Sequence, residues 1–82
     1  MAGNKDKFSV FIKEGCPFCK KALADLRKHK VTFTKVVCKD QGELKKNIKQ
    51  KNLRVPRITT FPRIFKGFTL VGGSDNLRKL LG

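Results

Sequence analysis

A Cys-x-x-Cys motif between a short apolar run and a helical pattern is the feature that most constrains the fold of this chain. The run Phe8–Ile12 predicts a buried strand, whereas Ala22 and Leu26 recur at the spacing of one helix face. Cys16 and Cys19 lie between these two patterns. The sequence therefore predicts a strand that ends just before the motif and a helix that begins within it.

The predicted helix start favours an ionised thiol. Pro17 suits the first helical position, where its missing N–H removes no hydrogen bond, and this places Cys16 near the N-cap. Unpaired backbone N–H groups and the positive end of the helix dipole stabilise an anion there, so we expect Cys16 to ionise more readily than a free cysteine. Cys19, one turn further along the same side, is close enough for a disulfide with Cys16. The pair predicts chemistry in which one sulfur attacks and the other resolves.

Length and composition limit the setting of this chemistry. With 82 residues, we expect a single domain over residues 1–82. No segment approaches the roughly 20 apolar residues of a membrane span, and the polar start Met1–Lys7 lacks the apolar segment of a signal peptide. We therefore expect a cytoplasmic protein that does not contact membranes. In that reducing compartment a Cys-x-x-Cys motif is more often catalytic or metal-binding than a structural disulfide.

The second property of the composition is a formal net charge of +14. The basic residues are spread from Lys5 to Lys79 without an arginine-rich block or a known binding motif, and the aromatic residues are all Phe. This pattern favours a generally basic surface over a dedicated nucleic-acid site. Such a field is able to steer acidic proteins or an anionic thiol toward the motif.

The rest of the chain continues the alternation of strands and helices. After the first strand (Lys7–Ile12) and helix (Pro17–Lys28), the patterns predict a strand at Val31–Val37, a helix at Gln41–Asn52, a hairpin of Phe61–Phe65 and Phe68–Val71 with a turn at Lys66-Gly67, and a helix at Asn76–Leu81 capped by Ser74 or Asp75. A right-handed crossover makes the first two strands parallel, and the hairpin adds an antiparallel pair. This order (β-α-β-α-β-β-α) predicts a three-layer α/β/α fold with a four-stranded mixed sheet.

Four motifs, in this order along the chain, resemble those of dithiol glutaredoxins, and the likeness extends from Phe8 to Leu81. They are Lys13, three residues before the first cysteine; Cys16-Pro17-Phe18-Cys19, similar to Cys-Pro-Tyr-Cys; Thr60-Phe61-Pro62, similar to Thr-Val-Pro, whose proline is cis in the family; and Gly72-Gly73-Ser74-Asp75, similar to the helix start Gly-Gly-Cys/Ser-Asp. The resemblance implies a thioredoxin-like fold. It also implies glutathione-dependent reduction of protein disulfides and of glutathione mixed disulfides, with glutathione as co-substrate and a monomeric protein.

The resemblance also implies roles for single residues. Cys16 is then the nucleophile that forms a mixed disulfide with glutathione, and Cys19 is the resolving thiol. Lys13 stabilises the thiolate and pairs with the glycine carboxylate of glutathione, unless it is simply one more surface lysine. The Phe61 backbone, turned by a cis bond before Pro62, pairs with the glutathione peptide.

The helix start supplies the other end of the implied glutathione groove. The N–H groups of Ser74 and Asp75 hold the γ-glutamyl carboxylate, and the Asp75 side chain meets its amino group. Both residues also suit a purely capping role. Phe18, Thr60 and Gly73 complete the groove that the resemblance implies.

Several positions depart from the family pattern or stay open. Phe18 replaces the commoner Tyr and removes a phenolic hydroxyl, and Phe61 replaces Val and reshapes the groove. Arg63 adds to the local positive charge. Lys49 and Gln50 are both candidates for the residue of the second helix that often joins the site, and Pro56 is a rival candidate for the cis proline.

Two remaining residues invite other functions. His29 lies about 15 Å along the helix from Cys19, so we expect a surface residue at the helix end rather than a metal ligand or base. Cys38 is expected at the end of a strand, with regulatory oxidation or glutathionylation as the alternative. We expect no zinc site, since a second close pair of ligands is missing. Pro17 argues against an iron–sulfur cluster, and the absence of Trp argues against a thioredoxin.

Overall fold

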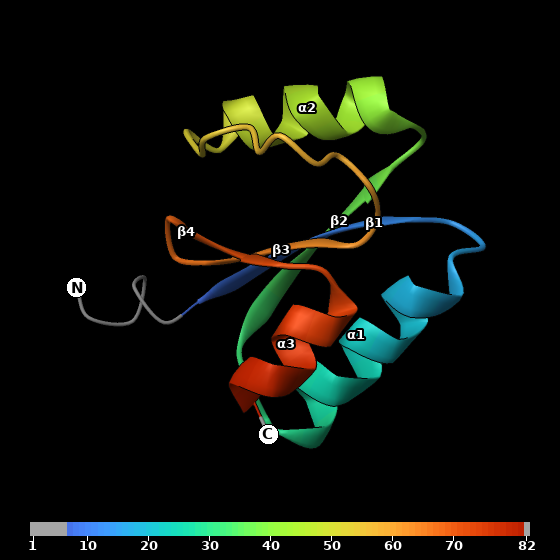
Figure 1. The fold of residues 1–82 in the computed structure, drawn as a ribbon, viewed down its shortest axis with the longest axis vertical. Helices are drawn as coiled ribbons and strands as arrows, with labels where there is room; N and C mark the ends of the chain where they lie inside the picture. The colour runs from blue at the N-terminus through green and yellow to red at the C-terminus, as the bar shows by residue number, and fades with distance from the viewer. Residues whose placement is uncertain (1–6, 82) are drawn as a thin grey trace.

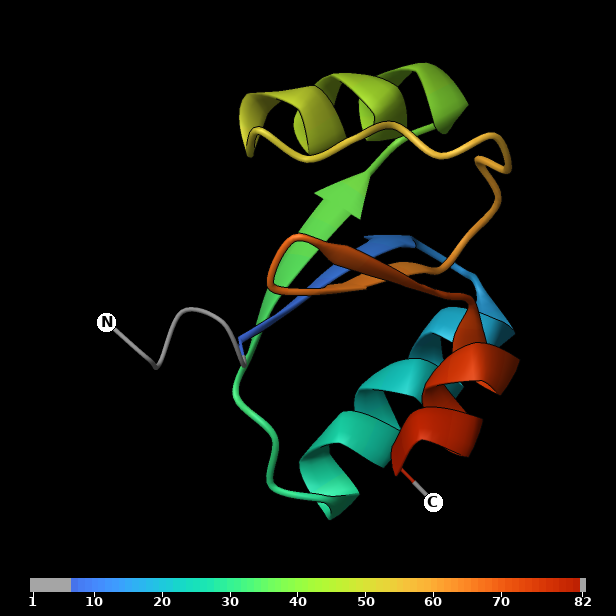
Figure 2. The same ribbon diagram turned by 60° about the vertical axis from the view of Figure 1, so that its left-hand side comes forward.

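A mixed four-stranded sheet separates the helices into two layers (Figures 1 and 2). In the computed structural model, which describes residues 7–81, strand order is β2-β1-β3-β4, with α1 and α3 on one face and α2 on the other. The elements in chain order are β1 (Phe8–Lys13), α1 (Pro17–Lys28), β2 (Phe33–Cys38), α2 (Gln41–Gln50), β3 (Arg63–Lys66), β4 (Thr69–Gly72) and α3 (Ser74–Leu81). The predicted three-layer α/β/α fold and its element order are confirmed.

Strand β1 lies inside the sheet and fixes the directions of its neighbours. It pairs with β2 in parallel, starting at Phe8 opposite Phe33, and with β3 in antiparallel orientation, where Val10 lies opposite Ile64. Strand β3 then pairs antiparallel with β4. These directions agree with a right-handed crossover followed by a hairpin. The carboxyl end of β1 therefore delivers the chain to the Cys-x-x-Cys motif.

The alternation of side chains along β1 divides the core in two. Val10 and Ile12 pack in the cluster that includes Leu26 of α1 and Leu77 of α3. Phe11 points to the opposite cluster, which includes Leu44, Ile48, Leu53 and Phe65. The Phe11 and Phe65 rings meet edge to face, with centroids 5.8 Å apart. Strand β1 is therefore covered by α1 and α3 on one face and by α2 on the other.

The second strand differs from the prediction at both ends, since it runs from Phe33 to Cys38, and the second helix differs at its end. The strand begins at Phe33 rather than Val31, because Lys30 has a positive φ of 55° and the Val31 N–H still bonds the Leu26 carbonyl at the end of α1. Helix α2 ends at Gln50 rather than Asn52, whose φ of 61° is left-handed. Local chain reversals thus set both boundaries, and apolar periodicity does not detect them.

The hairpin is shifted by one residue or more from its predicted position. The turn is at Gly67 and Phe68 rather than Lys66-Gly67, and Gly67 supplies a φ of +61°. Strand β3 begins at Arg63 rather than Phe61, because Pro62 has no N–H to donate to the sheet. Among residues 7–81, no helix has both the length and the hydropathy that a membrane crossing needs.

We expect the shared core of α1 and α3 to dominate stability. Leu26 is fully buried, so Leu26→Ala should lower the free energy of unfolding by about 3 kcal/mol through lost burial and a residual cavity. Urea unfolding at neutral pH under reducing conditions measures this. Leu80→Ala is the matched control because Leu80 is 52% exposed, and equal losses in the two variants would contradict the core assignment.

Candidate active site

Cys16 occupies the N-cap of α1, as predicted. Gly15, with a φ of +76°, turns the chain after β1, and Cys16 follows in an extended conformation with Pro17 as the first helical residue. The Cys16 sulfur accepts a hydrogen bond from the Cys19 N–H at 3.3 Å. One of the free N–H groups of the first helical turn is therefore directed at the Cys16 sulfur, the arrangement that stabilises a thiolate.

Cys19 lies beneath Cys16 in the core. It is 2% exposed, whereas Cys16 is half-buried, and both are free thiols. The pKa of the Cys19 thiol is raised to about 12, chiefly by burial and also by a hydrogen bond to Cys16 and the charge of Cys16, while a backbone hydrogen bond from Lys13 opposes the rise. Cys19 is therefore held as a protonated thiol beside Cys16, and the more accessible sulfur is Cys16.

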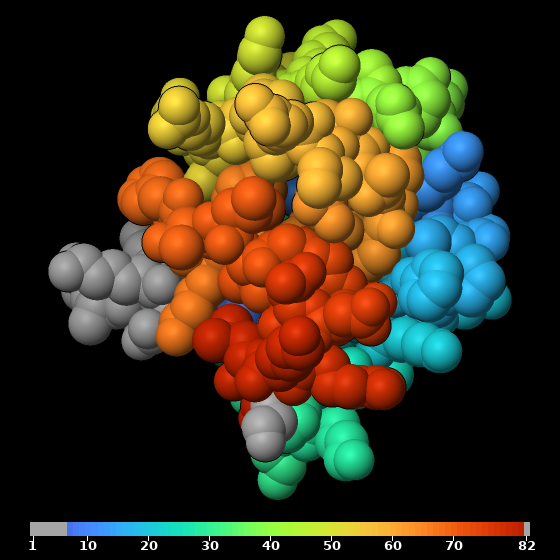
Figure 3. All heavy atoms as spheres, viewed as in Figure 1, coloured from blue at the N-terminus to red at the C-terminus, as the bar shows by residue number. Residues whose placement is uncertain are grey.

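A hollow of about 240 Å³ lies beside the dithiol, between the start of α1, the loop before β3 and the start of α3. Figure 3 shows the atoms of α3, in red, next to those that follow β1, in light blue, and α1 and α3 also pack together. Among the lining residues are Phe18, Phe61, Pro62, Gly73, Ser74 and Asp75, all of which the sequence singles out. Lys13 and Thr60 are exposed and do not line the hollow.

Comparison with known proteins assigns the family. The glutaredoxin family model matches residues 8–71. Glutaredoxin 1 of Rickettsia bellii is 32% identical over 71 residues, which are 87% of this chain and 72% of the relative. Glutaredoxin of Pseudomonas aeruginosa is also 32% identical, over 87% of this chain and 80% of the relative. The solution structure of glutaredoxin from Brucella melitensis superposes with a TM-score of 0.70 at 29% identity, covering 98% of this chain and 83% of that one.

The chain belongs to the glutaredoxin family. Members of this family are thiol–disulfide oxidoreductases, and the adjacent Cys16 and Cys19 thiols are consistent with a dithiol site of this kind. The predicted cis bond before Pro62 is present, and it is the only cis peptide within residues 7–81, so the rival candidate Pro56 is trans.

The start of α3 in this glutaredoxin corrects one prediction. The helix begins at Ser74 rather than Asn76, and the Gly73 carbonyl accepts the Leu77 N–H at 3.0 Å. Gly73 is therefore the N-cap, and neither Ser74 nor Asp75 has that role. The Asn76 side chain accepts the Gly73 N–H at 3.2 Å, which is half of a capping box. In the sequence, the signal for a helix that begins after Gly73 is Asn76, whose side-chain amide stands three residues further on.

Arg63 contributes more to the hollow than the sequence indicates. Its side chain is half-buried, its Nε donates to the Pro62 carbonyl at 3.0 Å, and a Cβ added to Gly73 would lie 3.0 Å from its Nη2. Burial lowers the pKa of Arg63. Within residues 7–81 the structure gives Arg63 no acidic partner, since the ion pair found there joins Arg78 and Asp25. A cation thus lines the hollow with its charge unpaired.

The other candidate residues lie away from the hollow. Lys49 and Gln50 are exposed on α2 and do not line it. His29 is an exposed residue at the C-cap of α1, as predicted. Cys38 ends β2 and is 1% exposed; its pKa is raised by burial, although the Asn47 amide donates to its sulfur at 3.3 Å. In the described part of the chain, no three metal-ligating side chains gather at one point.

The difference between the two thiols predicts selective alkylation. Iodoacetamide at pH 8 should label Cys16 of the reduced protein more than about tenfold faster than Cys19, because Cys19 is buried and protonated. Labelling of Cys19 should rise as the pH approaches about 12, the pKa of its thiol. Peptide mapping by mass spectrometry reads both sites, with buried Cys38 as an internal control. Comparable labelling of Cys16 and Cys19 at pH 8 would contradict this assignment.

Proposed function

We propose that this glutaredoxin uses glutathione to reduce protein disulfides and glutathione mixed disulfides. The observation that carries the proposal is the position of the Cys16 sulfur. It lies at the N-cap of α1, next to a hollow that holds an unpaired cation and the start of a second helix. The hollow suits a small anionic peptide bound through its sulfur to Cys16.

Cys16 starts both reactions as the nucleophile. Its thiolate attacks the glutathione sulfur of a mixed disulfide, a Cys16–glutathione bond forms, and the substrate leaves as a thiolate that takes a proton from water. A second glutathione thiolate then attacks this bond, which returns Cys16 as a thiolate and releases oxidised glutathione. The Cys19 N–H stays available to the Cys16 sulfur each time that negative charge returns to it.

Cys19 resolves the covalent complex when the substrate is a protein disulfide. Cys16 first bonds one substrate sulfur, and Cys19 then attacks Cys16 to release the reduced protein and leave a Cys16–Cys19 disulfide. Two of the causes that raise the Cys19 pKa come from Cys16 itself. Capture of Cys16 in a disulfide removes its negative charge, so Cys19 becomes a better nucleophile at the step that requires it. Two glutathione molecules then reduce the pair.

In this proposal, positively and negatively charged groups of the hollow both bind glutathione. We assign its peptide to the Phe61 backbone and its γ-glutamyl carboxylate to the N–H groups of Ser74 and Asp75, with the Asp75 carboxylate near its amino group. Arg63 supplies a further cation for a carboxylate. Lys13 and Thr60 are exposed and do not line the hollow. We assign Lys13 to the glycine carboxylate and Thr60 to the edge of the groove on the resemblance alone.

The expected partners follow from this chemistry. They are glutathione and disulfide-containing or glutathionylated proteins, which the reaction encounters in a reducing compartment. We propose a cytoplasmic monomer without a dedicated nucleic-acid site. The basic surface then serves to attract acidic substrates rather than to bind nucleic acid.

Cysteine variants test the reaction. With the mixed disulfide of glutathione and cysteamine as substrate, Cys16→Ser should lose activity, whereas Cys19→Ser should stay within about threefold of wild type. Reduction of a protein disulfide should require both cysteines. Glutathione-coupled NADPH oxidation in the presence of glutathione reductase measures each rate. An inactive wild-type protein, or an active Cys16→Ser protein, would refute the proposal.

The unpaired charge of Arg63 gives a second prediction. Arg63→Gln should raise the KM for glutathione about tenfold, because a charge-assisted hydrogen bond in a half-buried site is lost. The matched control is Arg27→Gln, which removes an exposed arginine in the last turn of α1. If both variants shift the KM equally, the effect comes from net charge and Arg63 is not a glutathione-binding residue.

A further inference from the structure

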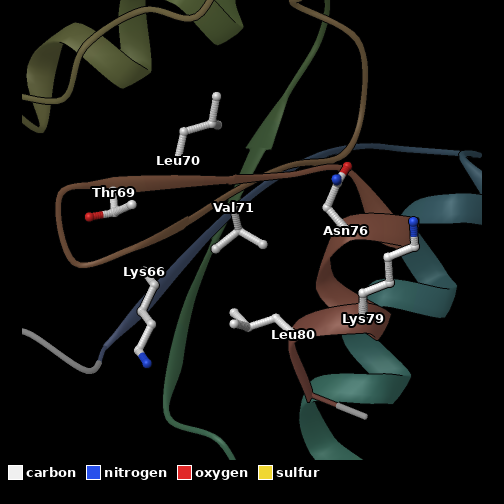
Figure 4. A pocket seen from close by; sticks show the side chains of 7 residues that line it. All are labelled: Lys66, Thr69, Leu70, Val71, Asn76, Lys79 and Leu80. Carbon is white, nitrogen blue, oxygen red and sulfur yellow. The ribbon is translucent and has the colours of Figure 1, made fainter.

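A second, larger cavity lies on the other side of Asn76. It is a groove of about 590 Å³ between strand β4 and helix α3, and we name it the β4–α3 groove (Figure 4). Its lining residues are Lys66, Thr69, Leu70, Val71, Asn76, Lys79 and Leu80. The roles assigned to the dithiol and the neighbouring hollow leave this groove without a function.

The groove combines an exposed apolar floor with two cations. Figure 4 shows Val71 of β4 and Leu80 of α3 pointing into the same space, with the Lys66 side chain extending along its strand side. Leu80 is 52% exposed although the neighbouring Leu77 is fully buried in the core. No lining residue is acidic, so the charges of Lys66 and Lys79 are not neutralised within the groove. This chemistry suits an occupant that is both apolar and acidic.

The position of β4 suits an extended occupant. β4 is the last strand in the order β2-β1-β3-β4, so within the described residues its outer edge has no strand partner. Exposed edges of this kind accept a further strand from another polypeptide, through backbone hydrogen bonds and pockets for alternate side chains. A polypeptide segment therefore fits the groove better than a compact small molecule.

The groove is also continuous with the candidate active site. Asn76 lines both the β4–α3 groove and the hollow that contains Arg63 and Asp75. A protein bound in the groove therefore has a short path over Asn76 to the hollow beside Cys16. This continuity favours a substrate protein over an unrelated partner.

We propose that the β4–α3 groove docks an extended acidic segment of the substrate protein that carries leucine or valine. The apolar side chain contacts Val71 and Leu80, and the acidic side chains pair with Lys66 and Lys79. The inference deepens the proposed function, on which it rests, because it assigns the substrate class of the same dithiol. The net positive charge of the protein attracts acidic proteins in general, and the groove selects those that also present an apolar residue.

Charge reversal in the groove tests the proposal. The substrates are glutathionylated peptides in which a glycine–serine spacer of graded length separates the cysteine from either an acidic leucine segment or a serine segment. At the best spacer length, Lys66→Glu/Lys79→Glu should raise the KM for the acidic peptide about tenfold, with kcat unchanged. Lys45→Glu/Lys46→Glu on the exposed face of α2 is the control, because it changes the net charge equally. Leu80→Asn should weaken the binding of the same peptide, although it leaves the net charge unchanged.

Two further measurements separate this proposal from the proposed function. Turnover of the small glutathione–cysteamine disulfide should be equal in wild type and groove variants, and failure of wild type in this assay would refute the glutathione chemistry alone. Fluorescence anisotropy of the acidic peptide with Ser in place of Cys measures docking without any reaction. Binding that is lost in the groove variants and kept in the α2 control supports the groove.

Other results would overturn the groove assignment. If the groove variants and the α2 variant lose equal affinity for the acidic peptide, the effect comes from the net positive charge of the protein and not from the groove. Tighter binding of a single-stranded oligonucleotide than of the peptide, with dependence on Lys66 and Lys79, would assign the surface to nucleic acid. Self-association abolished by Leu80→Asn in analytical ultracentrifugation would assign it to a second copy of this chain.

Discussion

The hydrogen bond from the Cys19 N–H to the Cys16 sulfur depends on nearly every other feature of the fold. It exists because a helix begins at Cys16, and the helix begins there because β1 ends at Lys13 inside the sheet and Gly15 reverses the chain. Strand β1 is fixed by pairing on both edges and burial on both faces. The Cys16 sulfur therefore follows a strand that is fixed on both edges and both faces. On the proposed function, this limits the reorganisation needed for attack.

The same apolar cluster supports both helix starts at the site. Leu26 of α1 and Leu77 of α3 are fully buried in it. The ion pair between exposed Arg78 and half-buried Asp25 adds a weak contact between these helices. A change in this cluster would move the N-terminus of α3 relative to that of α1, and with it the hollow between them. Stability and the geometry of the dithiol site are thus set by shared residues, as expected for a chain of 82 residues that has little core to divide.

Sequence predicted those parts of the fold that depend on apolar periodicity and on local motifs. The N-cap at Cys16 follows a local pattern. The cis bond before Pro62 and the grouping of Phe18 with Ser74 were instead expected from the resemblance to glutaredoxins. Boundaries set by left-handed residues, such as Lys30, were misplaced by a residue or two, since few residue types announce a positive φ. The N-cap of α3 and the partial burial of the Arg63 side chain were missed. Both depend on contacts of Gly73 with the side chains of Asn76 and Arg63, and only the folded chain fixes the directions of those side chains.

On the proposed function, the charges of the hollow let a protein this basic discriminate among anions. A net charge of +14 raises the local concentration of every anion and cannot distinguish glutathione from other negatively charged molecules. Discrimination requires a local arrangement, and the hollow places the acidic Asp75 among the same lining residues as the cationic Arg63. A simple anion gains from Arg63 and is repelled by Asp75, whereas a zwitterionic peptide can pair with both. On the proposed function, Asp75 therefore matters most by excluding anions that lack an ammonium group.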